Sequence, residues 1–235
     1  MTNNPRRGTG YRNVIYPPER WYLLTQLREK AKGIMEVLEG SHLASVVHGS
    51  VARGDVGEGS DIDVFIPFQV SSFVVETALQ REGVSINRRF VVQATPSYAM
   101  KAYIKLGKEV SISFPLMGMR KVEREFFRFG GEISVQDLRD DRRVRGVDKR
   151  LMLIEPNEQG HKESMVRGRE EYIAQLLDIS VQTVLDRVHA LSRREKVGRT
   201  GVFIEREVSE NETFEMVLKR LAEENPAVRR RQENY

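Results

Sequence analysis

Two aspartates in the first half of the chain stand at a spacing suited to binding a divalent metal ion. Asp61 and Asp63 lie at the start of the apolar segment that runs to Ile66, which has strand character. Because side chains alternate between the two faces of a strand, residues two apart project from one face, roughly 6 to 7 Å apart along the backbone. Carboxylates placed in this way are typical ligands of Mg²⁺ or Mn²⁺. We therefore expect Asp61 and Asp63 to form a metal site.

A phosphate-binding turn is expected a few residues earlier, where a short strand ends. Gly49 lets the backbone approach a ligand closely, and the Ser50 hydroxyl and the amides that follow suit a phosphate, especially if Ser50 begins a helix. Arg53 lies inside this turn, where a triphosphate would be its partner. The alternative for Arg53 is an ion pair with Asp55 or Glu58. Phosphate binding next to a metal site predicts nucleotide chemistry.

The combined pattern consists of Gly49-Ser50, Ala52-Arg53-Gly54 and Ser60-Asp61-Ile62-Asp63. It resembles the signature of the nucleotidyltransferase superfamily that includes DNA polymerase beta, and the minimal nucleotidyltransferases in particular. The resemblance implies that a nucleoside triphosphate and magnesium bind at Gly49, Ser50, Arg53, Asp61 and Asp63, and that a nucleotidyl group passes to an acceptor hydroxyl on nucleic acid or protein. In the structural alternative, Gly57 and Gly59 only shape a loop and the aspartates are solvated.

The third carboxylate that the resemblance implies is missing from its expected position. The matching strand, residues 108 to 115, carries Ser111 where the family pattern has an aspartate. A hydroxyl cannot supply the negative charge that two-metal chemistry requires. Glu109 shares a face with Ser111 and has the longer side chain, so it is the candidate substitute, although it also suits a solvated strand end. The sequence therefore predicts triphosphate binding with slow or absent transfer.

Composition bounds the class of protein. The chain of 235 residues, with 40% hydrophobic content, is long enough for a sizeable core, and we expect two domains. It has neither a membrane-length apolar run nor a signal-peptide core, which predicts a cytoplasmic protein without membrane association. With no cysteine and four histidines, thiolate or His-rich metal sites are not expected. The net charge of +4 permits an anionic partner, and the 31% charged content suits a thermophile.

Alternating helices and strands predict an α/β fold, a nucleotidyltransferase-fold mixed sheet with helices. The expected helices span residues 19–38, 73–80, 98–106, 119–129 and 212–221, and the expected strands span 44–47, 62–66, 84–94 and 109–116. Residues 1–18 read as a flexible basic arm, and residues 19–156 as the nucleotidyltransferase-like domain. Residues 156–164 are polar and read as a linker. We do not assign an oligomeric state.

The remaining segment, residues 164–235, resembles a small C-terminal winged helix-turn-helix module, a pairing similar to that in archaeal proteins. The helix pair covers residues 173–191, with Asp178 at the turn, Ser180 as the cap of the second helix and a buried stripe that includes Val181; residues 196–205 would form the wing. Candidate contacts to DNA or RNA are Gln182, Thr183, Arg187, Arg193, Arg194, Lys196 and Arg199. A protein-contact role is the alternative for this module. For the whole chain, the alternative to an enzyme is a catalytically degenerate nucleic-acid-binding regulator or RNA-associated factor.

Overall fold

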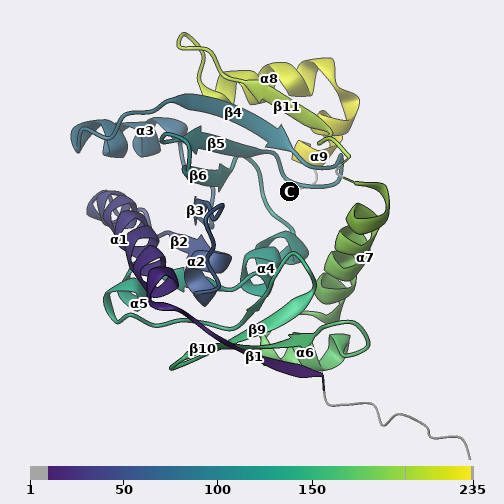
Figure 1. Cartoon of the computed structure of the whole chain (residues 1–235). Helices are drawn as coiled ribbons and strands as arrows, with labels where there is room; N and C mark the ends of the chain where they lie inside the picture. Colours follow the sequence, from purple (N-terminus) through teal and green to yellow (C-terminus); the bar gives the residue numbers. More distant parts are fainter. Residues whose placement is uncertain (1–9, 199, 234–235) are drawn as a thin grey trace, which may run out of the picture.

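The computed structural model describes residues 10–198 and 200–233, which form two sheets surrounded by helices (Figure 1). The elements are β1 (Tyr11–Ile15), α1 (Pro18–Gly40), β2 (Val46–His48), α2 (Ser50–Arg53), β3 (Ile62–Phe65), α3 (Ser72–Arg81), β4 (Arg88–Gln93), β5 (Lys101–Lys105), β6 (Val110–Pro115), α4 (Lys121–Phe129), β7 (Glu132–Ser134), α5 (Val135–Arg139), β8 (Gly146–Val147), β9 (Met152–Asn157), β10 (Gly160–Met165), α6 (Glu170–Leu176), α7 (Val181–Val197), β11 (Ile204–Glu207), α8 (Phe214–Glu224) and α9 (Pro226–Glu233).

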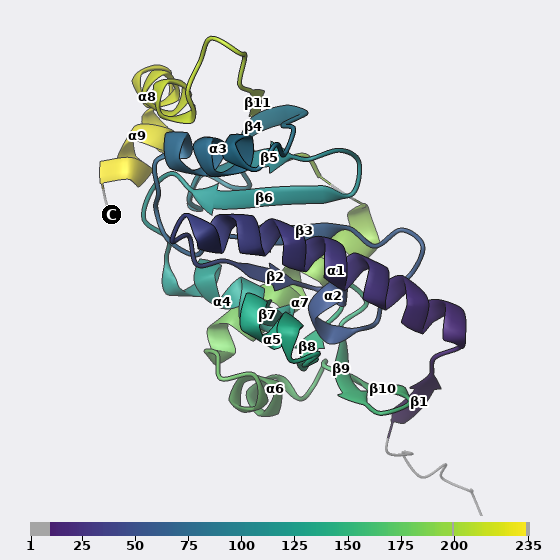
Figure 2. The same cartoon turned by 90° about the vertical axis from the view of Figure 1, so that its left-hand side faces the viewer.

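The larger sheet has seven strands in the order β11-β4-β5-β6-β3-β2-β7. Only the β3–β6 pair is parallel among the strand pairs described, so the sheet is mixed as expected. Helices α1 and α3 lie along one face of it (Figure 2), and alternate strand residues such as Val47, Val64 and Ile112 are fully buried on that side. The same alternation directs Asp63 and Ser111 to the opposite face.

The smaller sheet is antiparallel, in the order β1-β10-β9-β8. It packs with α6 and α7 around a separate core that includes Leu153, Ile173 and Val184, each fully buried. We call residues 11–16 and 146–198 the small lobe, and residues 18–145 and 204–233 the large lobe. The chain thus enters the small lobe twice before its last strand returns to the larger sheet.

A buried carboxylate joins the two lobes. Glu125 of α4 accepts hydrogen bonds from the backbone and hydroxyl of Ser180, at 3.0 and 2.5 Å, and from the hydroxyl of Thr183 at 2.5 Å. Burial alone would raise the pKa of Glu125, but the hydrogen bonds from Ser180 and Thr183 outweigh it and hold the pKa below its usual range. The α6–α7 pair is therefore docked on the large lobe.

The structure corrects the expected domain boundaries. Residues 11–15 of the expected basic arm pair with β10, while residues 1–9 lie outside the described part of the chain. The expected linker at 156–164 comprises the end of β9, the hairpin turn and most of β10. In the expected wing, Lys196 lies in the last turn of α7 and Ile204 begins β11, whose hydrogen-bonded partner is β4 of the larger sheet. The C-terminal elements therefore belong to both lobes.

One expected helix is a strand. Residues 98–106 are rich in good helix formers, but the chain forms β5 at Lys101–Lys105. Ala102 and Ile104 are fully buried between partly exposed neighbours, which is the two-residue period of a strand. The other expected helices and strands are present with shifted ends, and none of the helices in the described residues has the length and apolar character needed to cross a membrane.

Replacing Phe214 with alanine is expected to lower the free energy of unfolding by about 3 to 5 kcal/mol, because its ring is fully buried against Phe114 in the large-lobe core. Met216→Ala on the same helix is the control, since that side chain is 51% exposed and its loss should change stability by less than about 1 kcal/mol. Urea denaturation measures both. Equal midpoints for Phe214→Ala and wild type would mean that the C-terminal elements are not part of this core.

Candidate active site

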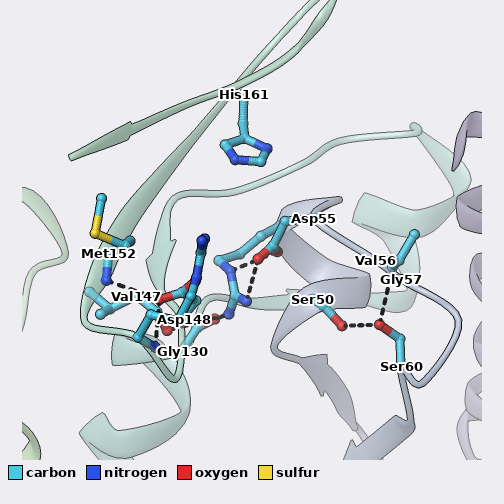
Figure 3. A network of polar contacts seen from close by, with 12 residues as sticks. Ser50, Asp55, Val56, Gly57, Ser60, Gly130, Val147, Asp148, Met152 and His161 are labelled. Atoms are coloured by element: carbon cyan, nitrogen blue, oxygen red, sulfur yellow. Dashed lines mark hydrogen bonds and ion pairs between the residues drawn. The ribbon is translucent and has the colours of Figure 1, made fainter. Parts of the chain in front are cut away.

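The turn between β2 and α2 has the backbone expected of a ligand-binding loop. Gly49 has φ 83°, a conformation that favours glycine, and a Cβ added there would meet no atom within 4 Å. Ser50 begins α2, and its hydroxyl donates a hydrogen bond to Ser60 Oγ at 3.1 Å. Ser60 Oγ also accepts a hydrogen bond from the Gly57 amide at 3.0 Å (Figure 3). The loop at residues 57–60 therefore holds Ser60 next to Ser50 and forms part of one wall of the cavity.

The two aspartates face this turn. Strand β3 lies between β2 and β6, which sets Asp63 opposite His48 on one side and opposite Ser111 on the other. Asp61 directly precedes the strand. Both aspartates line a cavity of about 400 Å³ together with Gly49 and Ser50. Arg53 lines the cavity as well, so the structure brings together all five predicted metal- and nucleotide-binding residues; their roles remain predictions.

Ser111 occupies the position next to Asp63 where a third carboxylate is missing. Its hydroxyl is buried and donates to Asp63 Oδ1 at 2.6 Å. Glu109 does not replace it, because its carboxylate is paired with Lys30 at 2.9 Å and is not among the residues lining the cavity. The Lys30 partner holds the pKa of Glu109 below its usual range. Glu109 therefore lies outside the cavity, and its predicted catalytic role stays a prediction.

The donor set suits one nucleotide-borne magnesium ion. Magnesium in such sites is held by one or two carboxylates together with substrate phosphates. Asp61 and Asp63 supply the carboxylates, and Ser111 occupies the adjacent place with a hydroxyl that is already used as a donor. Within the described residues, no group of three or more His, Cys, Asp or Glu side chains is arranged to hold a metal ion by itself. The side chains therefore fit one ion and lack the carboxylate for a second.

Arg53 forms a buried ion pair in the wall of the cavity, and its predicted nucleotide contact stays a prediction. Its guanidinium forms two hydrogen bonds to Asp55, both 2.9 Å, and donates to the backbone carbonyls of Gly130 and Val147. The Arg53 and Asp55 side chains are only 6% and 9% exposed. The ion pair with Asp55, the alternative interpretation of the sequence, is the one the structure contains.

His48 is a cavity residue to which the sequence analysis gave no role. It packs edge-on against Phe127, with ring centroids 4.9 Å apart, and lines the cavity beside Asp63. Burial lowers the pKa of His48 to about 4, although the Asp63 charge opposes the shift, so the imidazole is neutral at pH 7. Strand alternation was the available signal for His48, because it directs His48 to the face opposite the buried Val47. Asp63, its partner on β3, lies on that same face.

The opposite wall of the cavity combines aromatic and basic side chains from α4, the β8–β9 connection and α7. These are Phe126, Phe129, Lys149, Arg150, Arg187 and Arg194. Arg187, predicted to face a nucleic-acid groove, and Arg194, predicted to meet backbone phosphates, both line this cavity. The basic side chains of Lys149 and Arg150 belong to a run of mixed charge in which the sequence gives no single residue a distinct signal.

The other predicted nucleic-acid contacts have different surroundings. Thr183 is buried and bonded to Glu125, which contradicts its predicted contact. Gln182 is exposed and donates to Asp186, and Arg193 and Lys196 are exposed on α7. Arg199 lies outside the described residues. Asp178 has φ 51° and Ser180 accepts from the Thr183 amide, as the helix-turn-helix pattern predicts; Val181, expected to be buried, is 38% exposed.

The mixed sheet with its helices is consistent with a nucleotidyltransferase fold. Residues 28–115 match the family model of the nucleotidyltransferase domain, a segment that contains the turn, both aspartates and Ser111. The match supports the nucleotidyltransferase superfamily and a general function in nucleotidyl transfer. Comparisons with curated proteins and with solved structures found no match.

We expect Arg53→Gln to lower the free energy of unfolding by about 3 to 5 kcal/mol, because it leaves the buried Asp55 carboxylate without its partner. The control is Arg142→Gln, whose exposed pair with Asp137 should contribute about 1 kcal/mol or less. Chemical denaturation distinguishes them. A stable Arg53→Gln protein with weakened nucleotide affinity would support the interpretation of Arg53 as a nucleotide contact.

Proposed function

We propose that the protein binds a nucleoside triphosphate with magnesium, or manganese, and transfers its nucleotidyl group slowly to an acceptor hydroxyl. The observation that carries the proposal is the shared cavity of Asp61 and Asp63 with the Gly49-Ser50 turn, with Ser111 in place of a third carboxylate. Asp61 and Asp63 would hold the ion, and Gly49 and Ser50 would contact phosphate. Bound magnesium would neutralise charge on the phosphates and polarise the reacting phosphoryl group.

In the proposed reaction, the acceptor oxygen forms a bond to the α-phosphorus while the bond from that phosphorus to pyrophosphate breaks. The acceptor hydroxyl must also lose its proton. Ser111 cannot accept this proton as a carboxylate would, and its own hydroxyl hydrogen is directed to Asp63. Asp63 Oδ1 is thereby already occupied as an acceptor, and the proton of the acceptor hydroxyl would pass to solvent water. Binding without rapid turnover follows from this arrangement of donors.

The second candidate function is a nucleotide-binding or nucleic-acid-binding protein that keeps the fold without catalysis, and the Ser111–Asp63 hydrogen bond is the observation that favours it. A DNA or RNA partner remains part of the proposal. Of the predicted contacts, Arg193 and Lys196 stay exposed on α7 and are available to an external phosphate backbone. The proposed acceptor is a hydroxyl group of nucleic acid or protein. We also propose a cytoplasmic location.

Replacing Ser111 with aspartate should raise nucleotidyl transfer at least about tenfold, because a positioned base typically contributes 10²- to 10⁴-fold. Pyrophosphate release from labelled triphosphates, with magnesium and a mixture of cellular RNA, DNA and protein as acceptors, measures the rate. Asp63→Asn in the Ser111→Asp background should abolish the gain. Rapid transfer by the natural protein, reduced by Ser111→Asp, would refute the proposed role of position 111.

Two control variants accompany this experiment. Ser113→Asp places a carboxylate on the same strand and face but opposite Phe65, away from Asp63, and should give no increase. Glu109→Gln should leave any transfer by the natural protein unchanged, because Glu109 is paired with Lys30 outside the cavity. A loss of activity in Glu109→Gln would show that this side chain reaches the reacting groups after all.

A further inference from the structure

Two of the five basic side chains that line the cavity are already neutralised within the protein. Arg53 is paired with Asp55, and Arg150 donates to Asp148 at 2.6 Å and to Glu163 at 2.8 Å. The other three are Lys149, Arg187 and Arg194, and none of them forms an ion pair with a carboxylate of the described residues. The cavity therefore has a wall of uncompensated positive charge.

Arg187 is the most enclosed of these cations. Its guanidinium lies over the Phe126 ring, 4.7 Å from the centroid, and its buried Nε has no hydrogen-bond partner among the described residues. Burial holds the pKa of Arg187 below its usual range, and the neighbouring charge of Arg194 acts in the same direction. A partly buried guanidinium with an unsatisfied Nε is costly, so it is typically compensated by an anion. The missing partner would have to enter the cavity.

Formal charges identify a suitable anion. Asp61 and Asp63 with one magnesium ion sum to zero, and a triphosphate carries roughly four negative charges at neutral pH because the second pKa of a terminal phosphate is near 6. Lys149, Arg187 and Arg194 supply three positive charges across the same cavity. The planar guanidinium groups also match phosphate oxygens geometrically. The metal site is neutral and leaves the negative charge of the triphosphate uncompensated. The three positive charges of the opposite wall would balance most of it.

We propose that Arg187, Arg194 and Lys149 form a polyphosphate subsite that binds the β- and γ-phosphates of the triphosphate, opposite Asp61 and Asp63. This inference rests on the proposed function, which supplies the nucleotide. It assigns the inner side of α7 to nucleotide binding. Figure 1 shows α7 extending from the small lobe toward the larger sheet. The small lobe would therefore provide the basic wall of the nucleotide site.

A nucleic-acid backbone fits this wall less well. Backbone-binding cations usually follow an open groove, whereas Arg187 is enclosed beside Phe126 in the cavity that contains the aspartates. The outer side of α7 carries Arg193 and Lys196, which are exposed and do not line the cavity. The two sides of α7 thus separate the cations that line the cavity from those that do not.

Binding of inorganic tripolyphosphate to the full chain, measured by calorimetry in EDTA, tests the subsite without magnesium or a nucleobase. Arg187→Met should raise the Kd at least about tenfold, equivalent to about 1.4 kcal/mol. Arg194→Met and Lys149→Met should act in the same direction. Because Arg194 and Lys149 are exposed, these two variants test the proposal even if Arg187→Met does not fold. Arg193→Met, from the outer side of α7, is the matched control and should change the Kd less than about twofold.

A second titration separates this inference from the proposed function. With magnesium, wild-type protein should bind ATP, or another triphosphate from a panel, more tightly than the matching monophosphate, and Arg187→Met should reduce that preference at least about fivefold. Asp61→Asn should weaken magnesium-dependent triphosphate binding but leave tripolyphosphate binding in EDTA in place. Tripolyphosphate binding without any magnesium-dependent nucleotide binding would refute the proposed function alone.

Three results would overturn the subsite. The first is wild-type protein that binds magnesium nucleotides but not tripolyphosphate. The second is an unchanged triphosphate preference in folded Arg187→Met, Arg194→Met and Lys149→Met proteins. The third is a loss of single-stranded oligonucleotide binding in Arg187→Met with tripolyphosphate binding intact, which would assign the wall to a nucleic-acid backbone.

Discussion

The buried ion pair between Arg53 and Asp55 is the interaction on which the geometry of the cavity depends. One guanidinium holds the carboxylate that follows the glycine turn and also donates to carbonyls at the end of α4 and in β8. At the same place Gly146 lies so close to Gly131 that an added Cβ would be 2.5 Å from its backbone nitrogen. The turn, the large sheet and the small lobe therefore meet at one crowded point, which fixes the distance between the two walls of the cavity.

Local signals were enough to predict the aspartate wall. The glycine before Ser50, the alternation through Asp61 and Asp63, and the serine at position 111 are all features of short segments, and each acts through the backbone of its own turn or strand. The same is true of the long amphipathic helix α1 and of the Ser180 cap. Predictions of this kind succeed because the determining contacts are close in sequence.

The basic wall and the lobe boundaries depend on contacts distant in sequence, which no local pattern contains. Pairing of β1 with β10, and of β11 with β4, joins segments more than 100 residues apart, so an arm and a wing were expected where strands exist. Arg53 was ambiguous because Asp55 and a phosphate are equally good partners for a guanidinium. Residues 98–106 were misassigned because the helix propensity of lysine, alanine and methionine masked the alternation around Ala102 and Ile104.

The return of the chain through β11 also bears on how the small lobe could be exchanged between chains. The main part of the small lobe, residues 146–198, lies between β7 and β11, two strands of the same sheet, instead of following a completed sheet. Such a layout is that of an insertion within the large lobe rather than of a module appended at its end. Progressive deletion from the carboxyl end would remove α9 and α8 and then β11, an edge strand of the main sheet, so exchange of residues 146–198 between chains would need two splice points, one after β7 and one before β11, at opposite edges of that sheet.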